Sequence, residues 1–439
     1  MTPKALQALD RRLQRFLEDL TEPMGGSERR RWARVYLEGL LLDGERQSIE
    51  PMAARVAGAD VQALRQFVGQ SPWEVEEIER RLARKVVDLL SEPEVWIIDE
   101  TAFPKAGEHS VGVARQYCGT LGQVANCQVA VSLHWSSAEA SCPILWRLYL
   151  PQPWLEDTAR AAEVKLPPGT SYHRKTELAL EVIDQAVGWE WPRWPVVADS
   201  FYGNDFSFRQ ALRQRGLTYA VPVEPTTVVW TEDPKRPLPP PKQRGRPRKY
   251  PPLQALPQPQ DLRALAERLP RSAWRTVAWR QGSRGPQRSR FALLPVGAAH
   301  GWRQQLHPLR VVESLLVEWP TESTAPTKYW LAQLGSQPPG WRRLVRIAKA
   351  RWRVELDYRE LQEERGLDHS EGRQWLGWQH HVGRVSIAYA FLRSEQARLK
   401  KNFWCDLADG EEEAATHTHS AHRPLPVVPV PLRRLVIVT

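Results

Sequence analysis

Several features are scarce or missing in this sequence of 439 residues, and each absence argues against a class of protein. There are four cysteines, with no Cys-x-x-Cys pair and no Cys/His group at zinc-finger spacing, which argues against structural zinc and a disulfide framework. No Gly-rich phosphate loop ending in Gly-Lys-Ser/Thr is present, so we expect no use of ATP. The absence of a Gly-x-Ser-x-Gly elbow argues against a serine hydrolase.

Long hydrophobic runs are absent as well, and none approaches the ~18 residues that span a bilayer. The first residues, MTPKALQALDRRLQ, are charged and lack the apolar centre of a signal peptide. We therefore expect a soluble protein of a reducing cytoplasm that makes no membrane contact.

The charge that is present is unbalanced. Lys and Arg number 61 against 51 Asp and Glu, a net charge of +10. This excess favours a polyanionic partner such as nucleic acid, although solubility alone explains it equally well. The 20 tryptophans serve either packing or stacking on bases, and their number does not decide between the two.

The spacing of apolar residues changes along the chain. Residues 1–92 have helical spacing, as at Leu9, Leu13 and Leu17, and predict short helices that either bind DNA or cover the next domain. From residue 93 the pattern predicts three strands, at 95–102, 126–135 and 144–151, and then a helix at 176–187. A strand at 194–203, a helix at 206–216 and a strand at 217–223 follow. This order is that of the RNase H-like α/β fold.

Residues 224–340 interrupt this order with a basic, Pro-rich loop and strand-like runs at 274–280, 290–296, 309–318 and 328–334. Helical periodicity returns over 344–365 and 378–393. The fold class is therefore α/β, an RNase H-like catalytic core with a β-rich insertion and an N-terminal helical domain. The predicted domains are the helical domain (1–92), the first part of the core (93–223), the insertion (224–340), the C-terminal core helices (341–400) and a tail (401–439), loose from about Asp409.

Two carboxylates stand at the ends of predicted buried strands, Asp99 in VWIIDETA and Asp199 in WPVVADSFYG. A carboxylate in such a place must be paired, hydrogen-bonded or metal-bound, because burying an unpaired charge is costly. Oxygen ligands suit Mg²⁺ or Mn²⁺, and two such ions can activate a nucleophile and stabilise the leaving oxygen of a phosphodiester. The alternative is that each Asp merely caps the turn that follows it.

A metal site needs a third carboxylate, and the helix predicted over 344–365 supplies several. Arg351, Glu355 and Gln362 would share one face of this helix, where they suit a phosphate held beside a metal. The alternative is a solvated helix whose charges pair along its own surface.

Three segments resemble the catalytic blocks of DDE transposases from bacterial insertion sequences, in the group with a long β insertion before the Glu. They are DETAFPKAGEHSVGVARQYCGTLGQVANCQVAVSL (99–133), VVADSFYGNDFSFRQALRQRGLTYAVPV (196–223) and RWRVELDYRELQEERGLDHSEGRQWLGWQHHV (351–382). The resemblance implies an RNase H-like core, two Mg²⁺ ions that Mn²⁺ can replace, and Asp99, Asp199 and Glu355 as catalytic metal ligands. It also implies cut-and-paste DNA cleavage and strand transfer in a bacterial cytoplasm, in association with the nucleoid.

The resemblance further implies double-stranded DNA partners, namely the terminal inverted repeats and the target. Synapsis of two ends would bring two copies together as a homodimer, an expectation that follows from the reaction and not from residues. Two alternatives stay open: an RNase H-like nuclease without strand transfer, and a catalytically silent DNA-binding protein derived from a transposase.

Two positions depart from the Tyr-Arg-Glu-Lys signature of the wider group. Arg351 and Glu355 match its Arg and Glu, but Ala348 replaces the Tyr and Gln362 the Lys. Losing that Lys removes a positive charge that could bind a phosphate, and it leaves the metal ligands untouched. Glu360 is the second choice for the third ligand.

Basic residues in three places are candidates for DNA contact. A segment resembling an AT-hook core could lie in a narrow minor groove, or touch phosphates without specificity. Other basic residues flank Glu355 or follow Asp99, where they suit phosphate contacts. The candidates are Arg244, Arg246, Arg248 and Lys249 in the AT-hook-like segment, Lys349, Arg351 and Arg353 around the Glu, and Lys105, His109 and Arg115 after Asp99.

Four ring-bearing residues near the start of the last helix are predicted to pack. His380 and His381 are assigned to packing or surface rather than to ligand binding. Trp375 and Trp378 either support the Glu helix or stack on a flipped base, and packing is favoured.

Overall fold

The protein is described here by a computed structural model. The residues described are 2–44, 46–89, 93–138, 140–231, 258–282, 285–300 and 311–414, with side chains as far as Leu399. They form two compact units, one within Met1–Pro192 and Trp352–Thr439, the other within Arg193–Arg351.

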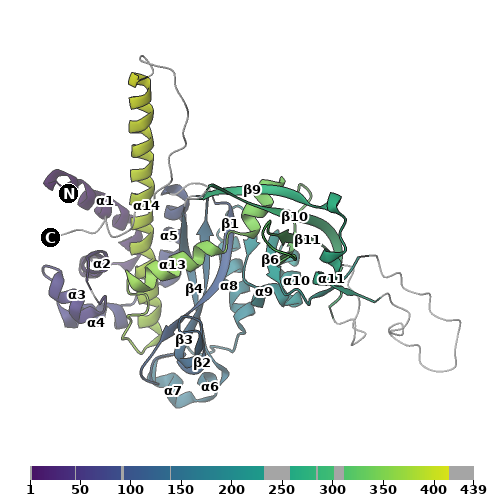
Figure 1. Ribbon diagram of the computed structural model, residues 1–439. Coiled ribbons are helices and arrows are strands. Elements are labelled where there is room, and N and C mark those ends of the chain that lie inside the picture. The colour runs from purple at the N-terminus through teal and green to yellow at the C-terminus, as the bar shows by residue number, and fades with distance from the viewer. Residues whose placement is uncertain are drawn as a thin grey trace. The chain divides into compact units, whose positions relative to one another are not determined.

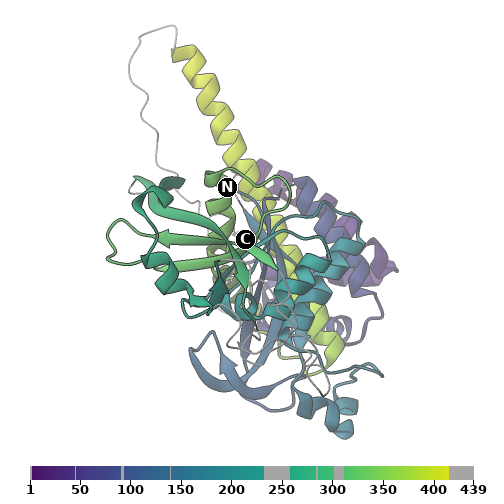
Figure 2. The same cartoon turned by 90° about the vertical axis from the view of Figure 1, so that its right-hand side faces the viewer.

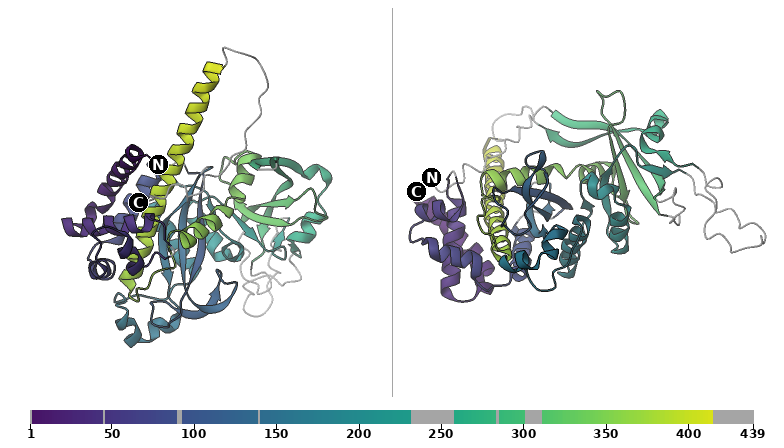
Figure 3. Two further views of the ribbon diagram at one scale, coloured as in Figure 1. Left: turned by 60° about the vertical axis from the view of Figure 1, so that its left-hand side comes forward. Right: turned by 90° about the horizontal axis from the view of Figure 1, so that it is seen from below.

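Five helices open the first unit, as the sequence predicts. Side-chain oxygens of Thr2 and Asp60 accept backbone N–H groups at the starts of the first and fourth helices, which stabilises these ends. The helices are α1 (Pro3–Thr21), α2 (Ser27–Leu41), α3 (Ile49–Arg55), α4 (Val61–Gln70) and α5 (Val75–Leu89). Helix α14 (Trp375–Ala414) runs along α2, α4 and α5, so the two ends of the chain share one helical layer (Figure 3).

An antiparallel sheet forms the centre of the first unit. It consists of β1 (Val95–Pro104), β2 (Ala114–Cys118), β3 (Gln123–Ser136) and β4 (Ser141–Tyr149), and β3 pairs with each of the other three (Figure 1). Three of these strands are predicted from the sequence. Strand β2 is not, because ARQYC is half exposed and carries no apolar run.

Helices cover both faces of this sheet. Short helices α6 (Gln152–Glu156) and α7 (Thr158–Glu163) follow β4, and α8 (Lys175–Gly188) packs on β3 and β4. Helix α13 (Trp352–Glu363) packs on β1 and β4, and α14 also contacts β4. The side chains of Asp99 and Glu100 point to opposite faces of β1, and Lys175 of α8 pairs with Glu100 at 2.8 Å. Helix α8 therefore lies on the Glu100 face.

The second unit contains mixed β-sheet, whose strands are drawn in teal and green in Figure 2. The strand order is β5-β6-β12-β11-β10-β7-β8, with β9 beside β10; β5 and β6 are parallel and the other pairs are antiparallel. The strands are β5 (Val196–Val197), β6 (Tyr219–Val223), β7 (Val228–Trp230), β8 (Gln260–Asp261), β9 (Arg275–Gly282), β10 (Gly285–Ala298), β11 (Val312–Trp319) and β12 (Lys328–Gln333). The helices are α9 (Ser200–Asn204), α10 (Phe206–Gln214), α11 (Leu262–Glu267) and α12 (Trp341–Ala348).

Strand β6 belongs to this sheet together with the predicted insertion. It pairs with β12 from Tyr219 opposite Gln333 to Val223 opposite Tyr329. The compact units therefore divide at 192/193 and 351/352, whereas the domain boundaries at 223 and 340 stay a prediction. The mixed α/β architecture confirms the predicted fold class.

Two helical predictions need correction. The helix expected over 344–365 is two helices, since α12 ends at Ala348 and α13 begins at Trp352. Lys349, Ala350 and Arg351 are ordinary helix formers, so the sequence gives no sign of this break. The tail expected to be loose from Asp409 is helical to Ala414, and residues 415–439 lie outside the described part. Of the helices described, none is both long and apolar enough to cross a membrane.

Candidate active site

Asp99 is a buried carboxylate in the interior of β1. It is 5% exposed, and its Oδ1 accepts the backbone N–H of Glu100 at 2.9 Å. The expectation that Asp99 ends its strand is wrong, because β1 stays paired with β3 as far as Pro104. Asp99 lies directly opposite Ser132, so both side chains are on the same face of the sheet.

Helix α13 covers that face. The hydroxyls of Tyr358 and Ser132 are 2.6 Å apart, and the Gln362 amide donates to Thr101 Oγ1 at 3.1 Å and to the Ala102 carbonyl at 3.2 Å. Burial raises the pKa of Tyr358 well above its ordinary value, and the negative charge of Asp99 raises it further. Tyr358 therefore keeps its proton and remains a hydrogen-bond donor beside Asp99.

A buried polar network fixes α13 in place. Asp357 is fully buried and contacts His134 Nδ1 at 2.9 Å, the Tyr389 hydroxyl at 2.8 Å and Arg393 at 3.2 Å. His134 Nε2 in turn lies 2.9 Å from the Ser132 hydroxyl, which joins this network to Tyr358. Burial opposes ionisation of Asp357, but hydrogen bonding and charge from His134, with the charge of Arg393, outweigh it and lower its pKa.

The sequence reasoning missed this network, although β3 carried a signal. Ser132 and His134 are polar residues two apart in an apolar strand, so both lie on one buried face and require partners there. Those partners come from α13, which is distant in sequence.

Glu355 lies in the first turn of α13 and is exposed. Tyr358 and Gln362 follow it by three and seven residues, so the three side chains line one side of the helix. The shared face predicted for Glu355 and Gln362 is therefore present, but Arg351 precedes the helix and is not on it. A carboxylate at a helix N-terminus is also stabilised by the positive end of the helix dipole.

Glu360, the second choice for the third ligand, is engaged elsewhere. Its carboxylate is 2.7 Å from Arg393 and accepts the Tyr389 hydroxyl at 2.8 Å. Burial raises its pKa, and Arg393 opposes that rise. Glu360 thus belongs to the same buried network as Asp357.

Asp199 belongs to the second unit, between β5 and α9. It caps α9, because its Oδ1 accepts the Tyr202 N–H at 3.3 Å, and its side chain stays half-buried. Gly203, in the same motif, allows α9 to lie against β6: an added Cβ would be 1.8 Å from the carbonyl oxygen of Pro222. The motif therefore has a packing role as well as its carboxylate.

Within neither unit do three or more described His, Cys, Asp or Glu side chains form a cluster that could hold a metal ion. Asp99 and Glu355 belong to the first unit, and Asp199 belongs to the second. All three offer only oxygen ligands, the donor type that Mg²⁺ and Mn²⁺ prefer.

Several predicted DNA contacts have partners inside the protein. Lys349 pairs with Glu318 at 2.6 Å and lies over the ring of Trp279 at 4.3 Å. Lys105 is half-buried, donates to the Ser370 carbonyl at 2.6 Å, and has a pKa lowered to about 8 by burial. A phosphate contact by either Lys would have to break these interactions.

Of the other predicted contacts that the structure describes, two are exposed and two are half-buried. Arg115 is exposed on β2, and His109 is exposed and 3.6 Å from Glu163. Arg351 and Arg353 are half-buried, and Arg353 donates to the Ala138 carbonyl at 2.7 Å. The AT-hook-like residues Arg244, Arg246, Arg248 and Lys249 lie outside the described residues.

The histidines and tryptophans of α14 pack mostly as predicted. His380 stacks on Trp73 with ring centroids 3.7 Å apart, and His381 Nδ1 is 2.8 Å from the Tyr36 hydroxyl. Burial lowers the pKa values of His380 and His381 to about 3 and about 4. Trp378 packs edge-on against Phe103.

Comparisons with known proteins identify the family of this chain. The family model for the DDE superfamily endonuclease matches residues 15–286, which include Asp99 and Asp199 and end before Glu355. A probable transposase for insertion sequence element IS701 from Microchaete diplosiphon is 30% identical over 190 residues. That alignment covers 42% of this chain and 46% of the relative, so the chain matches less than half of that protein's length.

Proposed function

Because this chain belongs to the DDE superfamily of endonucleases, we propose that it is a transposase that cleaves and rejoins DNA with Asp99, Asp199 and Glu355. One observation supports this most: buried Asp99 lies on the sheet face covered by α13, the helix that begins beside Glu355. Sequence blocks far apart in the chain thus place two of the proposed catalytic carboxylates on contacting elements.

The residue set fits the divalent ions that the family implies. Asp99, Asp199 and Glu355 present only carboxylate oxygens, and we propose that the two Asp residues hold two Mg²⁺ ions and Glu355 holds one of them. Two such ions, when bound, activate the attacking oxygen and stabilise the leaving oxygen of a phosphodiester. Mn²⁺ would replace Mg²⁺, since it accepts the same ligands.

The protein's own contribution is positioning. Tyr358 and Gln362 hold α13 against β1 and β3, which fixes the start of the helix and thus Glu355 relative to Asp99. Misplacing catalytic groups by a small distance costs large factors in rate. Arg115, Arg351 and Arg353 would hold phosphates of the terminal repeats and the target DNA, and two copies would pair in synapsis.

Gln362 bears on the catalytically silent alternative. It occupies the position of the signature Lys, and its amide is bonded to Thr101 and Ala102 near Asp99. The position therefore supports the catalytic helix without adding a charge for phosphate. Support of α13 by Gln362 keeps Glu355 in place for a metal, which speaks against the silent alternative. A nuclease without strand transfer would use the same residues.

The test is cleavage of DNA that carries the element's own ends, in Mg²⁺ and in EDTA. Wild type should cut only with the metal, and Asp99→Ala, Asp199→Ala and Glu355→Ala should each abolish cutting while DNA binding is retained. Glu363→Ala, an exposed acid on the same helix, is the matched control and should cut normally.

Each contrary outcome identifies a different error. Cutting by Glu355→Ala would show that the third ligand is wrong. Cutting without joined products would favour the nuclease, and tight binding of the ends without any cutting would favour the silent DNA-binding protein.

A further inference from the structure

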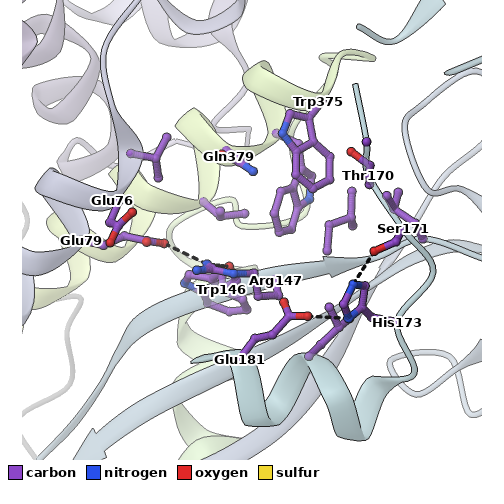
Figure 4. Close-up of a pocket in the computed structure, with 17 residues that line it drawn as sticks. Glu76, Glu79, Trp146, Arg147, Thr170, Ser171, His173, Glu181, Trp375 and Gln379 are labelled. Atoms are coloured by element: carbon purple, nitrogen blue, oxygen red, sulfur yellow. Dashed lines mark hydrogen bonds and ion pairs between the residues drawn. The ribbon is translucent and has the colours of Figure 1, made fainter. Parts of the chain in front are cut away.

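A cavity of about 400 Å³ lies in the first unit, and none of the residues proposed to hold metal or DNA lines it. Its walls come from α5, β4, the segment 169–173, α8 and α14. Figure 4 shows Glu76 and Glu79 on one side, Ser171, His173 and Glu181 on the other, and Trp375 with Gln379 nearby. A volume of this size is in the range of sites for small ligands or single side chains.

The cavity carries an excess of negative charge in a chain of net charge +10. Glu181 pairs with His173 at 2.6 Å, and Glu79 lies 3.8 Å from Arg147. Glu76 is exposed and makes no ion pair with any described residue. Phosphate would be repelled here, so the cavity suits a cation and not DNA.

Tryptophan rings complete the lining. Trp146 is buried, and its Nε1 already donates to the Ser386 hydroxyl at 2.9 Å. Trp378 is 2% exposed, and its Nε1 has no hydrogen-bond partner among the described residues. Trp375 is half-buried, so its ring is the most accessible of the three.

We propose that this cavity binds an arginine side chain of a peptide segment, through its carboxylates and its tryptophan rings. A guanidinium presents a planar fork of donors that matches carboxylates and also stacks on indole rings. A DNA base carries its phosphates with it, and a hydrated metal ion lacks the planar face that stacks on indole rings.

Glu79 gives this binding a distinctive signature. Burial raises the pKa of Glu79 to about 7, against the charge of Arg147 on β4 and a hydrogen bond from Gln185 on α8, while Glu76 on α5 adds to the rise. A bound guanidinium would lower that pKa. Binding near pH 7 should therefore release protons from Glu79.

The experiment is calorimetric titration of the full chain with acetyl-Gly-Arg-Gly-amide and with the same peptide containing citrulline, a neutral isostere. The arginine peptide should bind at least about tenfold more tightly, a factor that corresponds to about 1.4 kcal/mol. Glu76→Gln and Glu79→Gln should each weaken binding, and Glu74→Gln, an exposed neighbour outside the cavity, should leave it unchanged. Titrations in two buffers of different ionisation enthalpy should show proton release by wild type that Glu79→Gln lacks.

Three results would overturn the proposal. Equal binding of the citrulline peptide would show that the positive charge of the arginine is irrelevant. No binding of the arginine peptide at millimolar concentration would show that the cavity is not an arginine site. Stronger binding of spermidine, with displacement of the peptide, would assign the cavity to a free polyamine. The exposed Glu76 variant keeps the test valid if Glu79→Gln fails to fold.

Discussion

Glu79→Gln should remove a pH dependence from the stability of the protein. In the folded state burial raises the pKa of Glu79 from an ordinary value near 4.5 to about 7. One pKa unit corresponds to about 1.4 kcal/mol, so ionising this buried carboxylate costs the folded state about 3 kcal/mol. Gln has nearly the same shape and carries no charge, so it avoids this cost at every pH.

The sign follows from the direction of the pKa change. A carboxyl group whose pKa is raised by folding contributes its full stability below the unfolded value, and this contribution is lost as pH rises through the folded value. Wild type should therefore lose about 3 kcal/mol relative to Glu79→Gln between about pH 4.5 and 7.5. At about 2.1 cal/mol/K of unfolding entropy per residue, a chain of this size shifts by roughly 1–2 °C per kcal/mol, so the wild-type unfolding midpoint should fall by roughly 3–5 °C against that of the variant.

Thermal unfolding followed by tryptophan fluorescence measures this difference at a series of pH values. Glu74→Gln removes an exposed charge from the same region and should track wild type throughout. A difference between wild type and Glu79→Gln that stays constant from pH 4.5 to 8 would refute the reasoning, because it would mean that Glu79 titrates at its ordinary pKa.

Two further predictions concern the framework of the proposed site. Tyr358→Phe removes the hydroxyl that meets Ser132 at 2.6 Å; it should lower stability by about 1–3 kcal/mol and slow DNA cleavage while DNA binding is kept. Unchanged cleavage would show that α13 does not depend on this bond. Gly203→Ala places a Cβ 1.8 Å from the Pro222 carbonyl oxygen, so the second unit should be less stable. Faster amide hydrogen exchange in β6 would show this loss. Unaltered exchange there would contradict the close packing of α9 on β6.

Much of the fold can be predicted from local pattern. Helical spacing over the first 90 residues, the buried run around Asp99 and the strand-like runs of the insertion correspond to observed elements. The strand expected over 194–203 is only Val196–Val197, followed by helix α9. Errors arise where pattern is weak: β2 has no apolar run, and the break between Ala348 and Trp352 has no Gly or Pro to mark it. Strand β6 reads as part of the core, although it is hydrogen-bonded to β12 of the insertion.

The sequence by itself determined the family and the positions of the candidate carboxylates, because catalytic groups of one family keep their residue types and order along the chain. It also determined which stretches are apolar enough to be buried. Only the tertiary structure decided which polar groups are engaged inside the protein and which are left to bind metal or DNA. It places Glu360 with Arg393, Lys349 with Glu318 and Gln362 against β1, and it joins His134 to Asp357 across 223 residues. These pairings depend on distances between elements remote in the chain, and no local pattern of residues encodes such distances.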